Sequence, residues 1–264
     1  MTAATRLRRE PPAFRHVAVG RVERLTPRMV RVTFSGPELE GLVVEQPAAS
    51  VRVLLPSPGG AELVVPEWNG NEFLLPDGRR PAIRTFTPWR VDPDRLELDV
   101  GIVVHGGGVA SDWALAAQPG DEAAISGPGR GYTVDPDAAA FLVAGDETAI
   151  PAITQVLEEL PAAASVQVLV EIAHSDGRLE LPPRVGTGVE WCELAPGATP
   201  GDALGAAVHD AQLAAGTRVW VAGEAAGVQR IRRYLFEEQG IARAQTAVRG
   251  YWKHGRAGDG GDGE

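Results

Sequence analysis

The stretch AAAFLVAGDETAIPA, residues 138–152, marks a change in the pattern of apolar residues along the chain. Its first part, Ala138 to Gly145, is a continuous apolar run, which is typical of a strand buried on both faces of a parallel sheet. A helix is predicted to follow from Thr148 to Leu160. Pro151 is compatible with it, because a proline is tolerated in the first turn of a helix. A buried strand that leads directly into a helix indicates the start of an α/β domain.

The same alternation continues toward the C-terminus. Further strands are predicted in SVQVLVEIA, in VEWCEL and in TRVWVAG. Helices are predicted at Asp202–Ala214 and at Gly227–Gln239, with Gly240 as the stop of the second. Alternating strands and helices imply a parallel sheet with right-handed crossovers, so we expect an α/β domain over residues 138–254.

The preceding part of the chain has a different pattern. From Phe14 to about Thr133, short alternating strands are broken by proline and glycine, as in LLPSPGGAEL. The segment VRVTF, residues 30–34, alternates apolar and polar residues, and residues 96–104 keep a strict period of two. Many short strands with turn residues between them are typical of an antiparallel barrel or sandwich.

These patterns divide the chain into a β domain and an α/β domain. We predict an antiparallel β-barrel over residues 14–134 and place the join near Gly131–Asp137. The tail GRAGDGGDGE, residues 255–264, has nothing to bury, so it is predicted to be disordered.

Composition limits the kinds of protein that this chain can be. Its 264 residues are 44% hydrophobic, and the only cysteine is Cys192, which excludes an intrachain disulfide and a thiolate metal cluster. No apolar run is long enough to cross a bilayer, and the start MTAATRLRRE has no apolar segment or cleavage site after it. We therefore expect a cytoplasmic protein with no membrane span and no protein-bound metal.

The formal net charge of −10 argues against nucleic acid as a partner. An anionic ligand would need a local group of arginines, whose field acts over a Debye length of roughly 8 Å at physiological salt.

The segment IRTFTPWR, residues 83–90, is the first candidate for a binding site. On a strand, Arg84 and Phe86 share one face, and Thr85 and Thr87 share the other. An aromatic side chain can cover a flat ring, while arginine and threonine donors can bind a phosphate or a ring carbonyl. The same residues also fit an ordinary strand, because threonine is favoured there.

The segment VVHGGGVASDW, residues 103–113, is the second candidate. A strand ends at His105, and the three glycines that follow allow close approach of the backbone to a ligand. A short helix that begins near Val109 would point free N–H groups at the same place, and Ser111 adds a hydroxyl. A glycine-rich hairpin turn is the alternative. Together, the two segments indicate a flavin site with a pyrophosphate at the glycine turn.

The α/β half has two turns in which glycine precedes an acid, in AGDETAIPA and in VAGEAAG. They mark the carboxyl edge of the sheet, where ligands usually bind. Asp146 and Glu147 suit the N-terminal dipole of the following helix, but they would repel a pyrophosphate. The first turn therefore either caps its helix or faces a less charged part of a nucleotide.

Six segments between about Phe14 and Gly255 carry a resemblance to a known family. In chain order they are IRTFTP, VVHGGGVASDWALAAQPGD, SGPG, AGDETAIPAI, WVAGEA and GYWKHG. Taken together they resemble the siderophore-interacting proteins, flavin-dependent ferric-siderophore reductases related to ferredoxin reductases. The resemblance implies a β-barrel that binds FAD and an α/β domain approached by NAD(P)H, with a ferredoxin as an alternative donor.

The resemblance also implies a reaction. Electrons would pass from NAD(P)H through FAD to a ferric siderophore and release iron as Fe(II). Two alternatives stay open: a flavin reductase that acts on a quinone, a ferredoxin or another acceptor, and a siderophore-binding module without enzymatic activity.

Residue by residue, the resemblance assigns three groups. The residues implied to bind FAD are Arg84, Thr85, Phe86, Thr87, Val103, His105, Gly107, Gly108, Val109, Ala110, Ser111, Thr148 and Trp252. Those on the NAD(P)H side are Asp146, Glu147, Gly223 and Glu224. Those implied to meet the anionic siderophore are Arg52, Arg130, Arg249 and Lys253, each of which also fits a solvated surface cation.

Phe86 departs from the family pattern, which usually has tyrosine there. Ring stacking is retained, but the phenol hydroxyl and its hydrogen bond to the flavin are lost. Such a bond contributes roughly 0.5–1.5 kcal/mol, so FAD binding is expected to weaken without being abolished.

Overall fold

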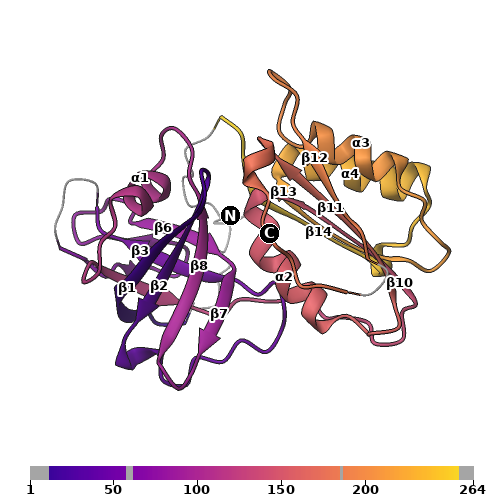
Figure 1. The fold of residues 1–264 in the computed structure, drawn as a ribbon. Coiled ribbons are helices and arrows are strands. Elements are labelled where there is room, and N and C mark those ends of the chain that lie inside the picture. The colour runs from indigo at the N-terminus through magenta and orange to yellow at the C-terminus, as the bar shows by residue number, and fades with distance from the viewer. Residues whose placement is uncertain (1–11, 58–61, 185–186, 256–264) are drawn as a thin grey trace, which may run out of the picture.

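The computed structural model describes residues 12–57, 62–184 and 187–255. Two domains lie side by side, the β domain first in the chain and the α/β domain second (Figure 1). Of the predicted disordered tail, only Gly255 belongs to the described residues. No helix in the described ranges is long and apolar enough to cross a membrane.

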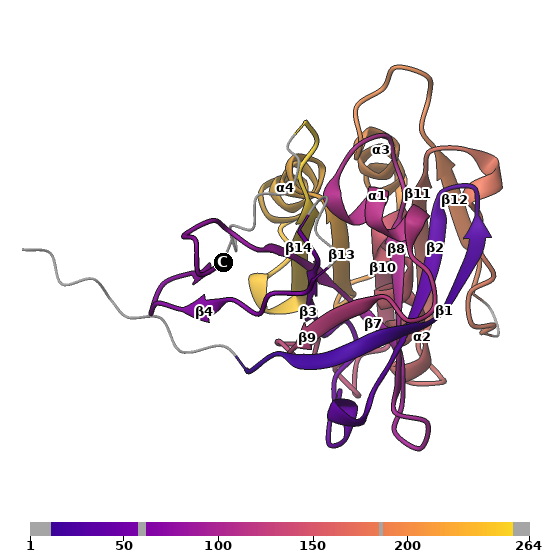
Figure 2. The same ribbon diagram turned by 90° about the vertical axis from the view of Figure 1, so that its left-hand side faces the viewer.

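The β domain is a seven-stranded antiparallel sheet in the order β6-β3-β9-β1-β2-β8-β7. Its strands are β1 (Arg15–Thr26), β2 (Met29–Ser35), β3 (Val51–Leu55), β6 (Ala82–Phe86), β7 (Pro88–Asp92), β8 (Glu97–Val103) and β9 (Glu122–Ser126). A small hairpin, β4 (Glu67–Trp68) and β5 (Phe73–Leu74), projects from the barrel (Figure 2).

The two edge strands of this sheet are consecutive in the chain, since only Thr87 separates β6 from β7. In a flat sheet of seven strands the edges would lie roughly 29 Å apart, which is six spacings of about 4.8 Å. One residue cannot span that distance, so the sheet must curl until its edges meet. The predicted antiparallel barrel is thus confirmed, and the segment IRTFTP forms its seam.

The predicted alternation fills the barrel. Val32, Phe34, Leu98 and Val100 are fully buried in one core cluster. The strand predicted over residues 96–104 is shorter than expected, because Leu96 has a φ of 53° and cannot continue the extended conformation.

The α/β domain contains a parallel sheet, as predicted. It has five strands in the order β12-β11-β10-β13-β14. Its strands are β10 (Ala140–Asp146), β11 (Ser165–Ile172), β12 (Val189–Glu193), β13 (Arg218–Glu224) and β14 (Thr246–Trp252). The last of these was not among the predicted strands, because its sequence TAVRGYW has neither an apolar run nor a period of two.

Helix α2 (Ile150–Glu159) lies on the face of this sheet that is turned toward the barrel, while α3 (Asp202–Asp210) and α4 (Ala225–Arg233) cover the other face (Figure 1). The predicted start of α2 at Thr148 is corrected by two residues, since a 3-10 turn, Glu147–Ala149, precedes the helix.

The other two predicted helix ranges also need correction. Helix α3 stops four residues early, because Ala211 is extended and the chain turns to pack Leu213 on the core. Helix α4 begins two residues early, because Glu224 caps it, and it continues as a π-helical turn, Tyr234–Glu238.

One hydrophobic core is shared by the two domains. Met29 and Ala48 of the β domain are buried in the same cluster as Ile150 and Ile153 of α2. Trp89, directly after the seam, packs against this cluster as well. Burial of apolar surface from both domains in one cluster fixes their relative position.

Gln155 of α2 adds polar contacts across the same interface. Its side-chain oxygen accepts a hydrogen bond from the N–H of Ala48 at 2.9 Å. Its side-chain nitrogen donates to the carbonyl oxygens of Pro88 at 2.5 Å and Trp89 at 3.3 Å. Helix α2 therefore holds the strand that leaves the seam.

Replacement of Gln155 by alanine is expected to lower the free energy of unfolding by about 1–3 kcal/mol, because three interdomain main-chain groups lose their partner. Urea denaturation measures this change. The control is Glu158→Ala on the exposed side of the same helix, expected to change stability by less than about 0.5 kcal/mol. Equal effects of the two substitutions would contradict the assigned role of Gln155.

Candidate flavin and nicotinamide site

The barrel seam presents the first group of predicted residues. Strand β6 pairs with β3, so Thr85 lies opposite Arg52 and Phe86 lies opposite Val51. Phe86 is half-buried and packs against the barrel core, while the guanidinium of Arg84 donates to the carbonyl oxygen of Ile83 at 2.8 Å.

Thr87 at the seam is buried, and its side chain lies beside the hydroxyl of Tyr251 on β14. Burial is the main cause that raises the pKa of this tyrosine. The residue that closes the barrel therefore lies against the last strand of the other domain.

The glycine turn after β8 leads into a short helix, α1 (Val109–Ala116). Gly107 and Gly108 have φ values of 81° and 123°, which favour glycine, and a Cβ added at Gly107 would meet nothing within 4 Å. The turn therefore faces open space. Gly108 precedes the helix without a side-chain cap, so its first N–H groups point toward that space.

Ser111 binds the main chain of the glycine turn. Its hydroxyl accepts from the N–H of His105 at 2.9 Å and donates to the carbonyl oxygen of the same residue at 2.7 Å. The side chain is buried and braces the glycine turn. A direct contact between this hydroxyl and a phosphate stays a prediction.

The seam and the glycine turn lie next to each other. Strand β6 contacts β8, and Phe86, Val109 and Ala110 pack against the same barrel core. Their neighbourhood offers a flat aromatic ring, a guanidinium and an uncapped helix N-terminus beside an open glycine turn. These are the groups that a flavin dinucleotide requires, so the residues present fit FAD.

Asp146 organises the carboxyl edge of the parallel sheet. Its carboxylate accepts from the N–H of Thr148 at 2.9 Å, from its hydroxyl at 2.5 Å, and from the N–H of Glu224 at 2.8 Å. It also accepts from Nε1 of Trp252 at 2.7 Å. The ends of β10, β13 and β14 are thereby joined through one buried side chain, which also caps the 3-10 turn Glu147–Ala149 that precedes α2.

Gly223 allows this arrangement. Its φ is 155°, and a Cβ at this position would lie 2.6 Å from Oδ2 of Asp146. A larger residue would push the carboxylate away from the strand end.

The other two acids predicted on the NAD(P)H side also bind protein groups. Glu147 forms an ion pair with Arg28 of the β1–β2 turn at 2.9 Å, across the domain interface. Glu224 accepts from the N–H of Gly227 at 2.7 Å and from that of His254 at 3.1 Å. Contact of these acids with a nucleotide stays a prediction.

Three of the four predicted siderophore cations lie on adjacent segments. Arg52 pairs with Ser126, directly before the loop that carries Arg130. Arg249 of β14 reaches this loop and donates to the carbonyl oxygens of Ala48 at 3.0 Å, Arg130 at 3.2 Å and Gly131 at 2.6 Å. Its guanidinium thus joins the two domains, while Lys253, one residue beyond Trp252, is exposed.

Several residues that shape this region were not predicted. Arg28, Gln155 and Tyr251 make contacts across the domain interface with residues that are distant in the chain. Nothing local in the sequence marks the first two. Tyr251 lies within the segment GYWKHG but was not assigned a role.

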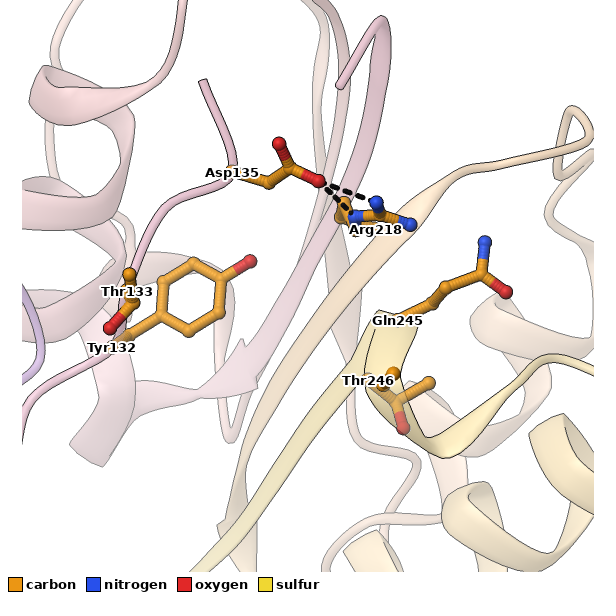
Figure 3. Close-up of a pocket in the computed structure, with 7 residues that line it drawn as sticks. Tyr132, Thr133, Asp135, Arg218, Gln245 and Thr246 are labelled. Atoms are coloured by element: carbon orange, nitrogen blue, oxygen red, sulfur yellow. Dashed lines mark hydrogen bonds and ion pairs between the residues drawn. The ribbon is translucent and has the colours of Figure 1, made fainter. Parts of the chain in front are cut away.

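A small pocket of about 130 Å³ lies at the opposite, amino-terminal edge of the sheet, where β13 and β14 begin (Figure 3). The Arg218–Asp135 ion pair lies on one side of it, and the ring of Tyr132 points toward the pair. The pocket is therefore separate from the seam and from the carboxyl edge.

Stability should depend on pH through Asp146. Burial raises the pKa of this carboxyl above its ordinary 3.8, although hydrogen bonds from Thr148, Trp252 and Glu224 oppose the rise. Between the ordinary and the raised value, the folded protein binds a proton that the unfolded chain does not. The contribution of Asp146 to the free energy of unfolding is therefore largest at low pH and declines as pH rises through this window.

The test compares the unfolding free energies of the wild type and Asp146→Asn from about pH 4 to 8. The difference, wild type minus variant, is expected to fall with rising pH. In Trp252→Phe, which lacks one hydrogen bond that stabilises the charged form, the decline should extend to higher pH. A difference that increases with pH would contradict the raised pKa.

Both domains match models of one protein family. Residues 18–132 match the siderophore-interacting FAD-binding domain, and residues 138–255 match the siderophore-interacting protein model. The chain is 32% identical to the NADPH-dependent ferric-chelate reductase of Escherichia coli, over 90% of this chain and 92% of that one. It is 30% identical to the ferric vibriobactin reductase of Vibrio cholerae, over 86% and 85% of the two chains.

Solved structures of siderophore-related proteins are similar to this chain over nearly its whole length. A siderophore utilization protein from T. fusca is 35% identical, with a TM-score of 0.83 over 94% of this chain and 95% of that one. A siderophore-interacting protein from Aeromonas hydrophila is 29% identical, with a TM-score of 0.76 over 93% of each chain.

Proposed function

The chain belongs to the siderophore-interacting protein family, and we propose that it is an FAD-dependent ferric-siderophore reductase that takes electrons from NAD(P)H. The observation that supports this most strongly is the position of the barrel seam. Its arginine and aromatic ring lie beside an open glycine turn, and its residue Thr87 lies beside Tyr251 of the α/β domain.

Bound FAD supplies the conversion of a two-electron donor into a one-electron reductant. The protein supplies position. Phe86 would cover one face of the ring, Arg84 would neutralise phosphate charge, and the main chain of Val109 and Ala110 would receive the pyrophosphate. Trp252, oriented by its bond to Asp146, would approach the ring from the α/β domain.

The substrate iron needs no ligand from the protein. Oxygen ligands of a siderophore hold Fe(III) much better than Fe(II), so reduction loosens the iron within its chelator. Among the described residues, no group of three or more His, Cys, Asp or Glu side chains is placed to hold a metal ion.

Local positive charge guides the siderophore to this place. The chain carries a net charge of −10, yet Arg52 and Arg130 lie on adjacent segments beside Arg249. Lys253 adds a further cation next to Trp252. An anionic ferric chelate is therefore attracted to the border of the two domains, although most of the molecule repels it.

The cellular location and the electron donor are also proposed. We expect a cytoplasmic location, and a ferredoxin is the alternative electron donor. A quinone or another acceptor would be favoured over ferric siderophores if ferric chelates failed to reoxidise the reduced flavin. A siderophore carrier would be favoured if the purified protein could not take up FAD.

Phe86→Tyr is expected to tighten FAD binding by roughly twofold to tenfold, because the added hydroxyl restores one hydrogen bond to the flavin. Titration of the FAD-free protein with FAD, followed by flavin fluorescence, measures the dissociation constant. The matched control is Phe236→Tyr, on the π-helical turn of the other domain. The assignment of Phe86 would be wrong if both variants bound FAD like the wild type.

Neutralisation of Arg130 or Lys253 by glutamine is expected to raise KM for a ferric siderophore roughly twofold to fivefold, with little change in kcat. The reason is the loss of attraction for an anion, so the difference from wild type should shrink at high salt. Arg95→Gln, in the β7–β8 hairpin, is the control and should leave KM unchanged. An effect on kcat alone would speak against a substrate-binding role.

The overall proposal is tested by anaerobic reduction of the FAD-loaded protein with NADPH or NADH, then reoxidation with a panel of ferric chelates. Rapid reoxidation by ferric siderophores with release of Fe(II) is expected. A reduced flavin that persists with every ferric chelate would overturn the proposal.

A further inference from the structure

Three helices of the α/β domain begin at the carboxyl edge of its sheet, the edge at which Trp252 lies. In dinucleotide-binding folds, the pyrophosphate of the cofactor binds at such a helix N-terminus, where free N–H groups and the helix dipole attract an anion. The availability of these N–H groups therefore decides how the electron donor can be recognised.

In this chain, carboxylates from the strand ends already occupy the starts of α3 and α4, and a third carboxylate holds the 3-10 turn that precedes α2. At the turn before α2, Asp146 accepts from the N–H of Thr148. At the start of α4, Glu224 accepts from the N–H of Gly227 at 2.7 Å.

The third carboxylate, Glu171, lies at the end of β11 and caps the neighbouring helix α3. Its two oxygens accept from the N–H groups of Gly201 at 2.7 Å and Leu204 at 2.9 Å. The residue is only 4% exposed, so water does not compete with these bonds. The occupancy does not depend on the charge of the carboxyl group, because a protonated carboxyl fills the same space.

The starts of α3 and α4 are packed closely against each other. A Cβ added at Gly201 would lie 2.7 Å from the Cα of Gly227, so α3 and α4 touch through two glycines. A phosphate group is larger than a methyl group and cannot enter between them.

The β domain offers the opposite arrangement. Helix α1 begins after Gly108 without a side-chain cap, beside an open turn. Among the described helices, α1 thus has a start prepared for a pyrophosphate, at the predicted flavin site, whereas acids fill the starts of α3 and α4 and hold the turn before α2.

We propose that the α/β domain recognises its electron donor through the nicotinamide half, and that Asp146, Glu171 and Glu224 exclude the pyrophosphate and adenosine half from the sheet edge. The inference rests on the proposed function and specifies its donor. A reduced nicotinamide mononucleotide would then serve nearly as well as the complete dinucleotide, because the second half adds little binding free energy.

The first test is direct binding to the FAD-loaded protein. Isothermal titration calorimetry with 2′,5′-ADP, which represents the half of NADPH without nicotinamide, is expected to show no saturable binding below about 1 mM. In stopped-flow experiments, reduced nicotinamide mononucleotide should reduce the flavin within about tenfold of the rate given by NADPH at equal concentration. Micromolar binding of 2′,5′-ADP, or a mononucleotide more than about a hundredfold slower, would overturn the proposal.

A substitution tests the cause. Glu171→Ala frees the N–H groups of Gly201 and Leu204, so the affinity for 2′,5′-ADP should rise at least about threefold. The matched control is Glu193→Ala, which removes an exposed acid at the end of β12 without freeing a helix start. A folded Glu171→Ala protein with unchanged affinity would contradict the role of this carboxylate. If that variant does not fold, the wild-type comparison of ligands decides.

The two proposals can fail separately. Protein reduced chemically with dithionite needs no nicotinamide donor, so its reaction with ferric siderophores tests the proposed function alone. Tight binding of 2′,5′-ADP by a protein that still reduces ferric siderophores would overturn only the inference about the donor.

Discussion

Closure of the barrel through a single residue is the constraint on which the rest of the structure depends. Because Thr87 alone separates the two edge strands, the segment before it must lie at the seam and the segment after it must lead away. Gln155 binds the outgoing strand, Tyr251 lies beside Thr87, and a shared apolar core packs against Trp89 and Tyr251. A ring bound at the seam is thereby placed at the border of the α/β domain without a flexible linkage.

The molecule uses its charges in two different ways. On the α/β side, buried carboxylates such as Asp146 and Glu171 satisfy main-chain N–H groups and join strand ends to helix starts. On the border with the barrel, arginines collect on adjacent segments, and Arg249 binds three main-chain carbonyl oxygens of the β domain. Acids therefore contribute to the fold, while the cations at the border are proposed to attract an anionic substrate that the net charge would otherwise repel.

Sequence patterns predicted the architecture because hydrophobic periodicity reports burial directly. The apolar run of β10 and the alternation in β2 and β8 each reflect the faces that these strands bury. Strand β14 was missed because its sequence contains glycine and arginine, and both serve contacts made by distant segments. Gly250 leaves room for Ala225, and Arg249 reaches the barrel.

The site was predictable only in part, for the same reason. The glycine turn and the seam can be recognised from local sequence motifs. The partner of Glu147, in contrast, lies 119 residues earlier in the chain. Asp146, in the first of the two glycine–acid turns, was expected to suit a helix start, but the sequence could not show that Trp252 and Glu224 bind the same carboxylate. Pairing of distant segments is set by tertiary packing, which local patterns do not contain.

The most direct measurement is a crystal structure of the protein soaked with FAD. The isoalloxazine is expected between the seam residue Phe86 and Trp252, with the pyrophosphate at the start of α1. A flavin bound elsewhere, or a seam whose side chains leave no room for the ring, would contradict the account.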